Sequence, residues 1–143
     1  MIQINAYTAT SALGTDLSAY VTRLKSGQSG LIPCDFPRCS LDTYIGRIPN
    51  LEQCSLPKDM DPAYLCRNNQ MAYQALISNQ FDQQVHQMIQ QHGSDRVGVI
   101  LGTTTSGFLE VEQAYQTFKK TEHFPQDYSF AKQSECGHPE LWR

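Results

Sequence analysis

The sequence predicts an α/β protein, because segments of strand character alternate with amphipathic helical segments along the chain. Residues 2–7 alternate apolar and polar side chains before a run of small residues, and residues 96–101 include a continuous apolar stretch. Between and after them, apolar side chains recur at helical spacing. This alternation indicates a mostly parallel sheet covered by helices on both faces, although three strands are few for that architecture.

The first helix is expected to begin at Thr15 or Asp16, either of which can cap it, and to end before Gly27. Its apolar face consists of Leu17, Tyr20, Val21 and Leu24. Residues 27–38, rich in Gly, Pro and Ser, are expected to form a loop. Residues 43–48 carry β-type side chains and are closed by a proline, which indicates a short edge strand.

The second half of the chain predicts three more helices and the buried strand. One helix is expected to start at Asp61-Pro62 and to end near Ser78, and the next runs from Phe81 to Gly93. Residues 96–101 then form a strand buried on both faces, which opens through residues 102–107 into a helix that begins at Phe108. The predicted order is strand, helix, strand, helix, helix, strand, helix.

Length and charge limit the class of protein. The chain has 143 residues, 40% of them hydrophobic, which suits one domain. The net charge is only −3, and the basic residues are scattered, so we expect no nucleic acid partner. No apolar run approaches a membrane span, and the N-terminus lacks signal-peptide character. A soluble, cytoplasmic protein that does not bind membranes is expected.

The cysteines and histidines suggest neither a metal site nor a nucleophile. Five cysteines are an odd number, which favours reduced thiols. Zinc is the alternative for Cys34, Cys39, Cys54 and Cys66, but no C-x2-C pair is present. Cys136 has His138 close in sequence, without a buried strand or helix to hold the two together. The remaining histidines, His86, His92 and His123, are widely separated. We therefore assign no catalytic residue, no metal and no cofactor.

The turn at residues 102–107 has the strongest local signal for a ligand, since it joins a buried strand to a helix N-terminus, which favours an anion or polar ligand. The turn lacks the lysine of a P-loop and the glycine spacing of a dinucleotide site. The plainer interpretation is a tight turn whose hydroxyl groups cap the helix. A small phosphate-binding or other ligand-binding α/β domain stays open as an alternative function.

Five segments, taken in their order and spacing, resemble the N-terminal region of elongating β-ketoacyl-acyl-carrier-protein synthases. They are Ile4–Gly14 (INAYTATSALG), Leu24–Leu31 (LKSGQSGL), Tyr44–Pro49 (YIGRIP), Arg67–Leu76 and Val97–Gly107 (VGVILGTTTSG). The resemblance extends to about residue 130, and residues 131–143 diverge. The chain 1–143 is accordingly expected to be a partial ketosynthase N-terminal domain.

The resemblance implies a layered αβαβα thiolase-like fold, of which this chain would hold an incomplete N-terminal half. It also implies a homodimer, or a heterodimer with another ketosynthase chain, and an acyl carrier protein as partner. The family reaction is a decarboxylative Claisen condensation between a cysteine-bound acyl thioester and malonyl-carrier protein, in fatty acid, polyketide or polyene biosynthesis.

The resemblance carries over few site residues. Thr104, Thr105, Ser106 and Gly107 correspond to the family segment that borders the acyl pocket near the dimer interface. Arg67 corresponds to a helix associated with carrier-protein docking, whereas the plainer interpretation is a solvated charge on a helix surface. The family's nucleophilic cysteine stands in a Thr-Ala-Cys turn, which the surroundings of Cys136 do not match.

Because that cysteine and the two family histidines are absent from these 143 residues, the chain is expected to be inactive by itself. Apolar faces that the second half of the fold would cover are then expected to be exposed, which favours pairing with another chain. The alternative function is a non-catalytic partner subunit of an active synthase, similar to chain-length-determining subunits.

Overall fold

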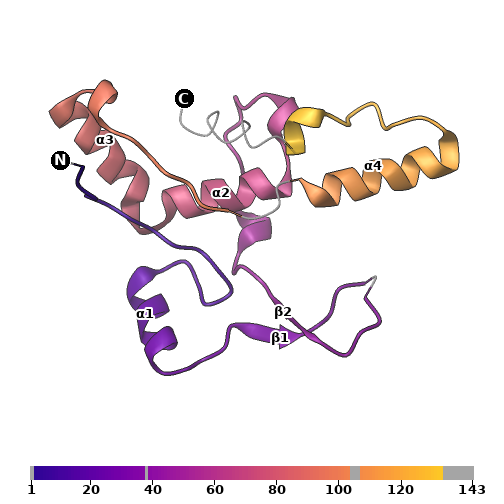
Figure 1. Cartoon of the computed structure of the whole chain (residues 1–143), viewed down its shortest axis with the longest axis horizontal. Coiled ribbons are helices and arrows are strands. Elements are labelled where there is room, and N and C mark those ends of the chain that lie inside the picture. Colours follow the sequence, from indigo (N-terminus) through magenta and orange to yellow (C-terminus); the bar gives the residue numbers. More distant parts are fainter. Residues whose placement is uncertain (1, 38, 104–106, 134–143) are drawn as a thin grey trace. The chain divides into compact units, whose positions relative to one another are not determined.

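The computed structural model describes residues 2–37, 39–103 and 107–133 (Figure 1). These residues contain both helices and strands and are mostly helical, with a single antiparallel sheet of two short strands. No layered thiolase arrangement is recognisable among them. The α-helices and strands are α1 (Leu17–Lys25), β1 (Leu31–Pro33), β2 (Tyr44–Gly46), α2 (Arg67–Ile77), α3 (Phe81–His92) and α4 (Phe108–Thr121).

The chain divides into two compact units. Unit 1 comprises Met1–Gln53 and Gln74–Val99, and unit 2 comprises Cys54–Tyr73 and Ile100–Arg143. The buried apolar side chains of unit 1 include Leu51, Leu76, Phe81 and Val85. Those of unit 2 include Cys66, Ala72 and Ala114.

The prediction of the first helix is confirmed as α1. Asp16 caps it, because its Oδ1 accepts a hydrogen bond of 2.7 Å from the backbone N–H of Ala19. This bond, with a second one from the Ser18 hydroxyl, holds the pKa of Asp16 below its ordinary value. Gly27 follows the helix in the left-handed region, with φ of 69°, which glycine adopts without steric cost.

The sheet is a hairpin, and it partly corrects the prediction. β2 lies within the strand predicted at residues 43–48, whereas β1 lies inside the segment predicted to be a loop. The two strands pair antiparallel, with Ile32 opposite Ile45. The Gly, Ser and Pro residues around β1 are typical of loops, so the sequence there does not predict a strand. The pairing with β2 is what identifies it.

The strands predicted at residues 2–7 and 96–101 are wrong. Neither segment is a strand, and Ser94–Arg96 forms a short 3-10 turn. Ile4 is 83% exposed and Ile100 is 98% exposed, so the apolar character of these segments does not reflect burial in the described structure. Strand character needs a neighbouring strand to satisfy the backbone, and no described segment supplies one here.

The helix predicted from Asp61 to Ser78 is interrupted at its start. Asp61 does cap a turn, since its Oδ1 accepts from the N–H of Ala63 at 2.8 Å, but this turn is a 3-10 segment that ends at Tyr64. Leu65 is extended, with ψ of 95°, and α2 begins only at Arg67. The predicted helices at 81–92 and from Phe108 are confirmed as α3 and α4.

α2 and α3 are separated by two left-handed residues that are not glycine, Asn79 and Gln80, each with φ of 57°. The Asn79 amide bonds to residues near α1 on both of its polar atoms. Its Oδ1 accepts from the N–H of Leu17 at 3.0 Å, and its Nδ2 donates to the carbonyl of Thr15 at 2.7 Å and to the hydroxyl of Thr8 at 3.0 Å.

Three sequence segments of unit 1 meet at Ala12. A Cβ placed on Gly30 would lie 2.4 Å from the carbonyl carbon and oxygen of Ala12, and one placed on Gly46 would lie 3.0 Å from the Ala12 Cβ. Positions 30 and 46 therefore need glycine because a backbone or small side chain occupies the space that a larger residue would fill.

Candidate functional site

Of the residues predicted to border an acyl pocket, Gly107 lies within the described structure, and Thr104, Thr105 and Ser106 lie outside the described residues. Gly107 is buried and precedes α4 in the left-handed conformation, with φ of 68°. It offers no side chain to cap the helix, but its carbonyl accepts from the N–H of Val111 at 3.1 Å. The residue that precedes α4 thus has a left-handed backbone conformation, which glycine adopts more readily than other residues do.

Arg67, the residue predicted to dock a carrier protein, is exposed and is the first residue of α2. Its backbone N–H donates to the Glu110 carboxylate, with N···Oε1 of 3.2 Å. Glu110 stands in the first turn of α4, three residues after Gly107. Within unit 2, Glu110 thereby links the start of α2 at Arg67 to the start of α4, which follows Gly107.

The N-terminus of α2 already binds an acidic side chain, that of Glu110. Helix N-termini carry a partial positive charge and unpaired N–H groups, which attract carboxylates and phosphates. Glu110 supplies such a carboxylate to α2 while it stands in the equally favourable first turn of its own helix. A phosphate would have to compete with this side chain at the first N–H of α2.

Cys66 lies beside this junction but has the wrong chemistry for a nucleophile. Its side chain is only 7% exposed, and its Sγ contacts the carbonyl of Lys132 at 3.6 Å. Burial raises the pKa of the Cys66 thiol above its ordinary value, and the nearby negative charge of Glu110 raises it further. The neutral thiol is therefore favoured, whereas a thiolate would be needed for attack on an acyl carbon.

Two buried asparagines follow Arg67 on α2. Asn69 is 2% exposed, and its Nδ2 donates to the carbonyl of Tyr64 at 2.7 Å, which ties the 3-10 turn to the helix. Asn68 is 7% exposed. Sequence reasoning missed the contribution of Asn69 and Glu110. No pattern in the sequence links Glu110 to α2, because the two residues that bond, Arg67 and Glu110, are 43 positions apart.

The thiols and imidazoles do not gather into a larger centre within the described ranges. No group of three or more His, Cys, Asp or Glu side chains there could hold a metal ion. Cys34, Cys39, Cys54 and Cys66 are free cysteines. His86 bonds locally through Nδ1 to the carbonyl of Asp82 at 2.8 Å. His92 and His123 are exposed, and Cys136 and His138 lie outside the described residues.

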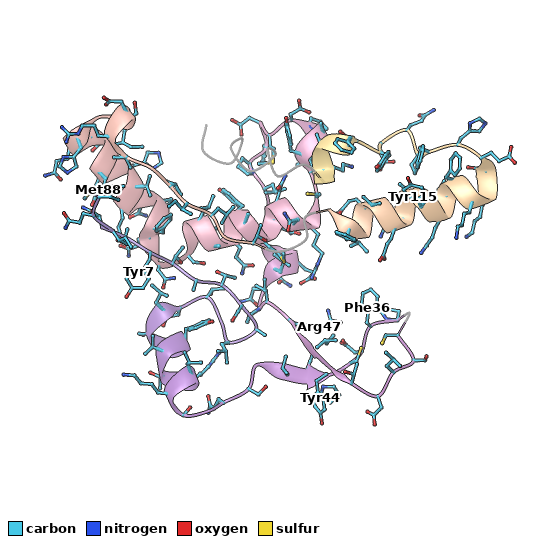
Figure 2. All side chains as sticks on the ribbon, viewed as in Figure 1. Tyr7, Phe36, Tyr44, Arg47, Met88 and Tyr115 are labelled. Carbon is cyan, nitrogen blue, oxygen red and sulfur yellow. The ribbon has the colours of Figure 1, made fainter. Side chains whose placement is uncertain are left out.

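An aromatic cluster forms the other distinctive feature of unit 2. Phe124 stacks on Phe118 and Tyr128, with ring centroids 4.8 and 5.2 Å apart, and meets Tyr115 edge-on at 5.4 Å. These contacts fold residues 124–128 back onto the last turns of α4. Figure 2 marks Tyr115 on that helix.

Among the described helices, none has both the length and the apolar character needed to cross a bilayer. Comparisons with protein-family models, with curated proteins and with solved structures find no match for this chain.

Proposed function

We propose that the chain is the N-terminal part of an elongating β-ketoacyl-acyl-carrier-protein synthase with a thiolase-like layered fold. The assembled enzyme would condense an acyl thioester with malonyl-carrier protein, with loss of carbon dioxide. The observation that carries the proposal is the order and spacing of the five segments quoted above. A single one of these short motifs would carry little weight, because glycine-rich turns are common in α/β proteins.

The contacts at Ala12 support this proposal. Ala12, Gly30 and Gly46 belong to the first three of the five segments, and they come together in unit 1. Segments that resemble one family and also contact one another support membership of that family more strongly than segments that lie far apart in the structure would. Gly30 of LKSGQSGL and Gly46 of YIGRIP thereby acquire a structural reason, because the turn that contains Ala12 lies too close for a larger residue at either position.

In this proposal the 143 residues contribute binding surfaces and no catalytic group. The sequence contains no Thr-Ala-Cys turn, and the buried Cys66 has a raised pKa. Thr104, Thr105, Ser106 and Gly107 would border the acyl pocket, and Arg67 would contact the carrier protein. The coding DNA beyond codon 143 provides a direct test, since a Thr-Ala-Cys turn followed by two histidines is expected there, in frame or in another frame.

A carrier-protein titration tests the assignment of Arg67. Arg67→Glu is expected to weaken binding of an acidic acyl carrier protein by less than about fivefold, because an exposed ion pair contributes under about 1 kcal/mol. The matched control is Arg96→Glu, which reverses the charge of another exposed arginine. Dissociation constants from fluorescence anisotropy of a labelled carrier protein give the comparison. Equal effects of the two variants would contradict docking at Arg67.

A non-catalytic partner subunit is the second candidate function. The observation in its favour is the exposure of large apolar side chains: Ile2 is 100% exposed and Ile100 is 98% exposed, as a chain completed by another chain would require. Co-purification of the 143-residue chain with a full-length synthase, together with the absence of any Thr-Ala-Cys turn in the downstream DNA, would favour this function over the first.

A further inference from the structure

The 3-10 turn Phe130–Gln133 is held at a corner of unit 2 where two helices begin (Figure 1). It contacts α4 and the 3-10 turn that precedes α2. The carbonyl of Lys132 accepts from the Cys66 thiol at 3.6 Å, and the next residue, Arg67, bonds through its N–H to Glu110 in the first turn of α4. The chain beyond this turn therefore starts from the place where α2 and α4 meet.

Three large apolar side chains around this corner are exposed. Leu65 is 44% exposed, Phe108 is 61% exposed and Phe130 is 72% exposed. Each of them stands two positions before one of the bonded residues of the corner. We refer to these three side chains as the apolar corner of unit 2. Exposed apolar side chains gathered in one place indicate a surface that another segment covers.

The other exposed aromatic side chains of unit 2 already pack on one another. Phe124 stacks on Phe118 and meets Tyr115 edge-on. Phe108 and Phe130 are the most exposed aromatic side chains among the described residues of unit 2. The apolar corner is therefore the part of this unit where most aromatic surface is left to cover.

The segment that follows Gln133 has the side chains and the reach to cover this surface. Residues 134–143 include two adjacent large apolar side chains, Leu141 and Trp142, and Trp142 is the only tryptophan of the chain. The stretch from Gln133 to Trp142 spans at most about 30 Å when extended. The whole of α4, with 14 residues, is about 21 Å long. Trp142 can therefore reach the apolar corner, and closing so short a loop costs little entropy.

We propose that residues 134–143 fold back onto the apolar corner, with Leu141 and Trp142 packed against Leu65, Phe108 and Phe130. A buried tryptophan removes about 150–250 Å² of its surface from water, and the two phenylalanine rings offer faces and edges on which it can stack. This segment is favoured over a separate protein because it is tethered at the corner, where its effective concentration is high. The inference does not depend on the proposed condensing function.

The fluorescence of Trp142 tests the proposal, because no other tryptophan contributes to it. The emission of the 143-residue chain is expected to lie at a shorter wavelength than that of a synthetic peptide of residues 134–143, and acrylamide is expected to quench it less. Both differences should persist on dilution, since the contact lies within one chain. An emission equal to that of the peptide would overturn the proposal. A shift that is lost on dilution would also overturn it, because Trp142 would then pack on a second copy.

A pair of phenylalanine variants tests whether Trp142 contacts the apolar corner. Phe130→Ser is expected to move the tryptophan emission toward that of the peptide, and the exposure of Phe130 means that its loss should not disturb the fold. Phe36→Ser is the matched control, because Phe36 is an exposed phenylalanine of unit 1, and it is expected to leave the emission unchanged. Equal shifts in the two variants, or no shift in either, would overturn the proposal.

A hydrophobic dye gives a readout from the apolar corner itself. Anilinonaphthalene sulfonate binds exposed apolar surface, so Trp142→Ser is expected to raise the dye fluorescence above that of the wild-type chain. Trp142→Phe keeps an aromatic ring and is expected to give the wild-type signal. Circular dichroism of each variant shows whether its helices are intact, so that uncovering is distinguished from unfolding. A Trp142→Ser chain with intact helices and the wild-type dye signal would overturn the proposal.

Discussion

The Asn79 side chain joins the α2–α3 corner to the N-terminal part of unit 1 through hydrogen bonds. Its amide makes three hydrogen bonds to groups between residues 8 and 17, at distances of 2.7–3.0 Å. One of these groups is the N–H of Leu17, which is unpaired within α1 because it stands at the helix start. Asn79 also tolerates the left-handed backbone better than most residues do. One side chain thus fixes both the α2–α3 corner and the start of α1.

Asn79→Ala is expected to lower the free energy of unfolding by about 3 kcal/mol, because about 1 kcal/mol is lost for each hydrogen bond. Urea titration followed by circular dichroism gives the value. Asn50→Ala is the control, since Asn50 is exposed and has the same φ of 57°, so it reports the backbone effect alone. Equal losses in the two variants would mean that the amide bonds of Asn79 contribute nothing.

Cys66 gives a pH dependence whose direction follows from burial. Because burial raises the pKa of this thiol in the folded chain, the folded chain holds the proton more tightly than the unfolded chain does. The resulting stabilisation is fully present below the unfolded pKa of about 8.5 and is lost as the pH rises through the folded value. Cys66→Ala should remove this component, so its unfolding free energy should fall less steeply above about pH 8 than that of the wild type. Parallel profiles would show that the thiol stays protonated equally well in both states.

At the scale of secondary structure, the helices could be predicted because their signals are local. The cap at Asp16, the glycines at positions 27 and 93, and the spacing of apolar residues all lie within a few residues of the helix they define. Of the two strands, β2 was predicted from its β-type residues, but β1 was not, because a strand depends on a partner that can be distant in sequence. Residues 2–7 have strand character without a partner, and Leu31–Pro33 has a partner without clear strand character.

The contacts at the candidate site could not be predicted from the sequence either, because they join residues that are distant in the chain. Arg67 and Gly107 were each singled out from the sequence, but their link through Glu110 spans 43 residues and leaves no periodic signal. A helix end near Ser78 is predicted from the sequence, and the break between α2 and α3 lies there. No glycine or proline marks it, and its physical cause is the set of distant contacts made by Asn79.

Gly30→Ala tests the meeting of the three segments at Ala12. The new Cβ would lie 2.4 Å from backbone atoms of Ala12, which cannot rotate away, so a loss of about 2 kcal/mol or more in unfolding free energy is expected. Gly98→Ala is the matched control, because a Cβ there meets nothing within 4 Å. Thermal unfolding of the two variants gives the comparison. A Gly30→Ala chain as stable as Gly98→Ala would show that the segments do not approach so closely.

At the scale of the whole molecule, the residues proposed to bind the acyl group and the carrier protein, Arg67 and positions 104–107, all belong to unit 2. The 143-residue chain is expected to form no carbon–carbon bond from acyl- and malonyl-carrier protein, because its sequence contains no Thr-Ala-Cys turn with the two later histidines that the family uses. Mass spectrometry of the carrier-bound products, with an intact elongating synthase as the positive control, measures this. A condensed product from the chain alone would contradict the assignment.

The corner at Asn79 has a consequence for the order of folding. Residues 67–92 contain neither glycine nor proline, so short-range interactions favour one unbroken helix through the corner. The bonds that impose the break join residues 62 to 71 positions apart and require closure of a long loop. We therefore expect α2 and α3 to form early as a single rod, which bends only when the N-terminal segment arrives, so that the last contact to form determines the final direction of the chain.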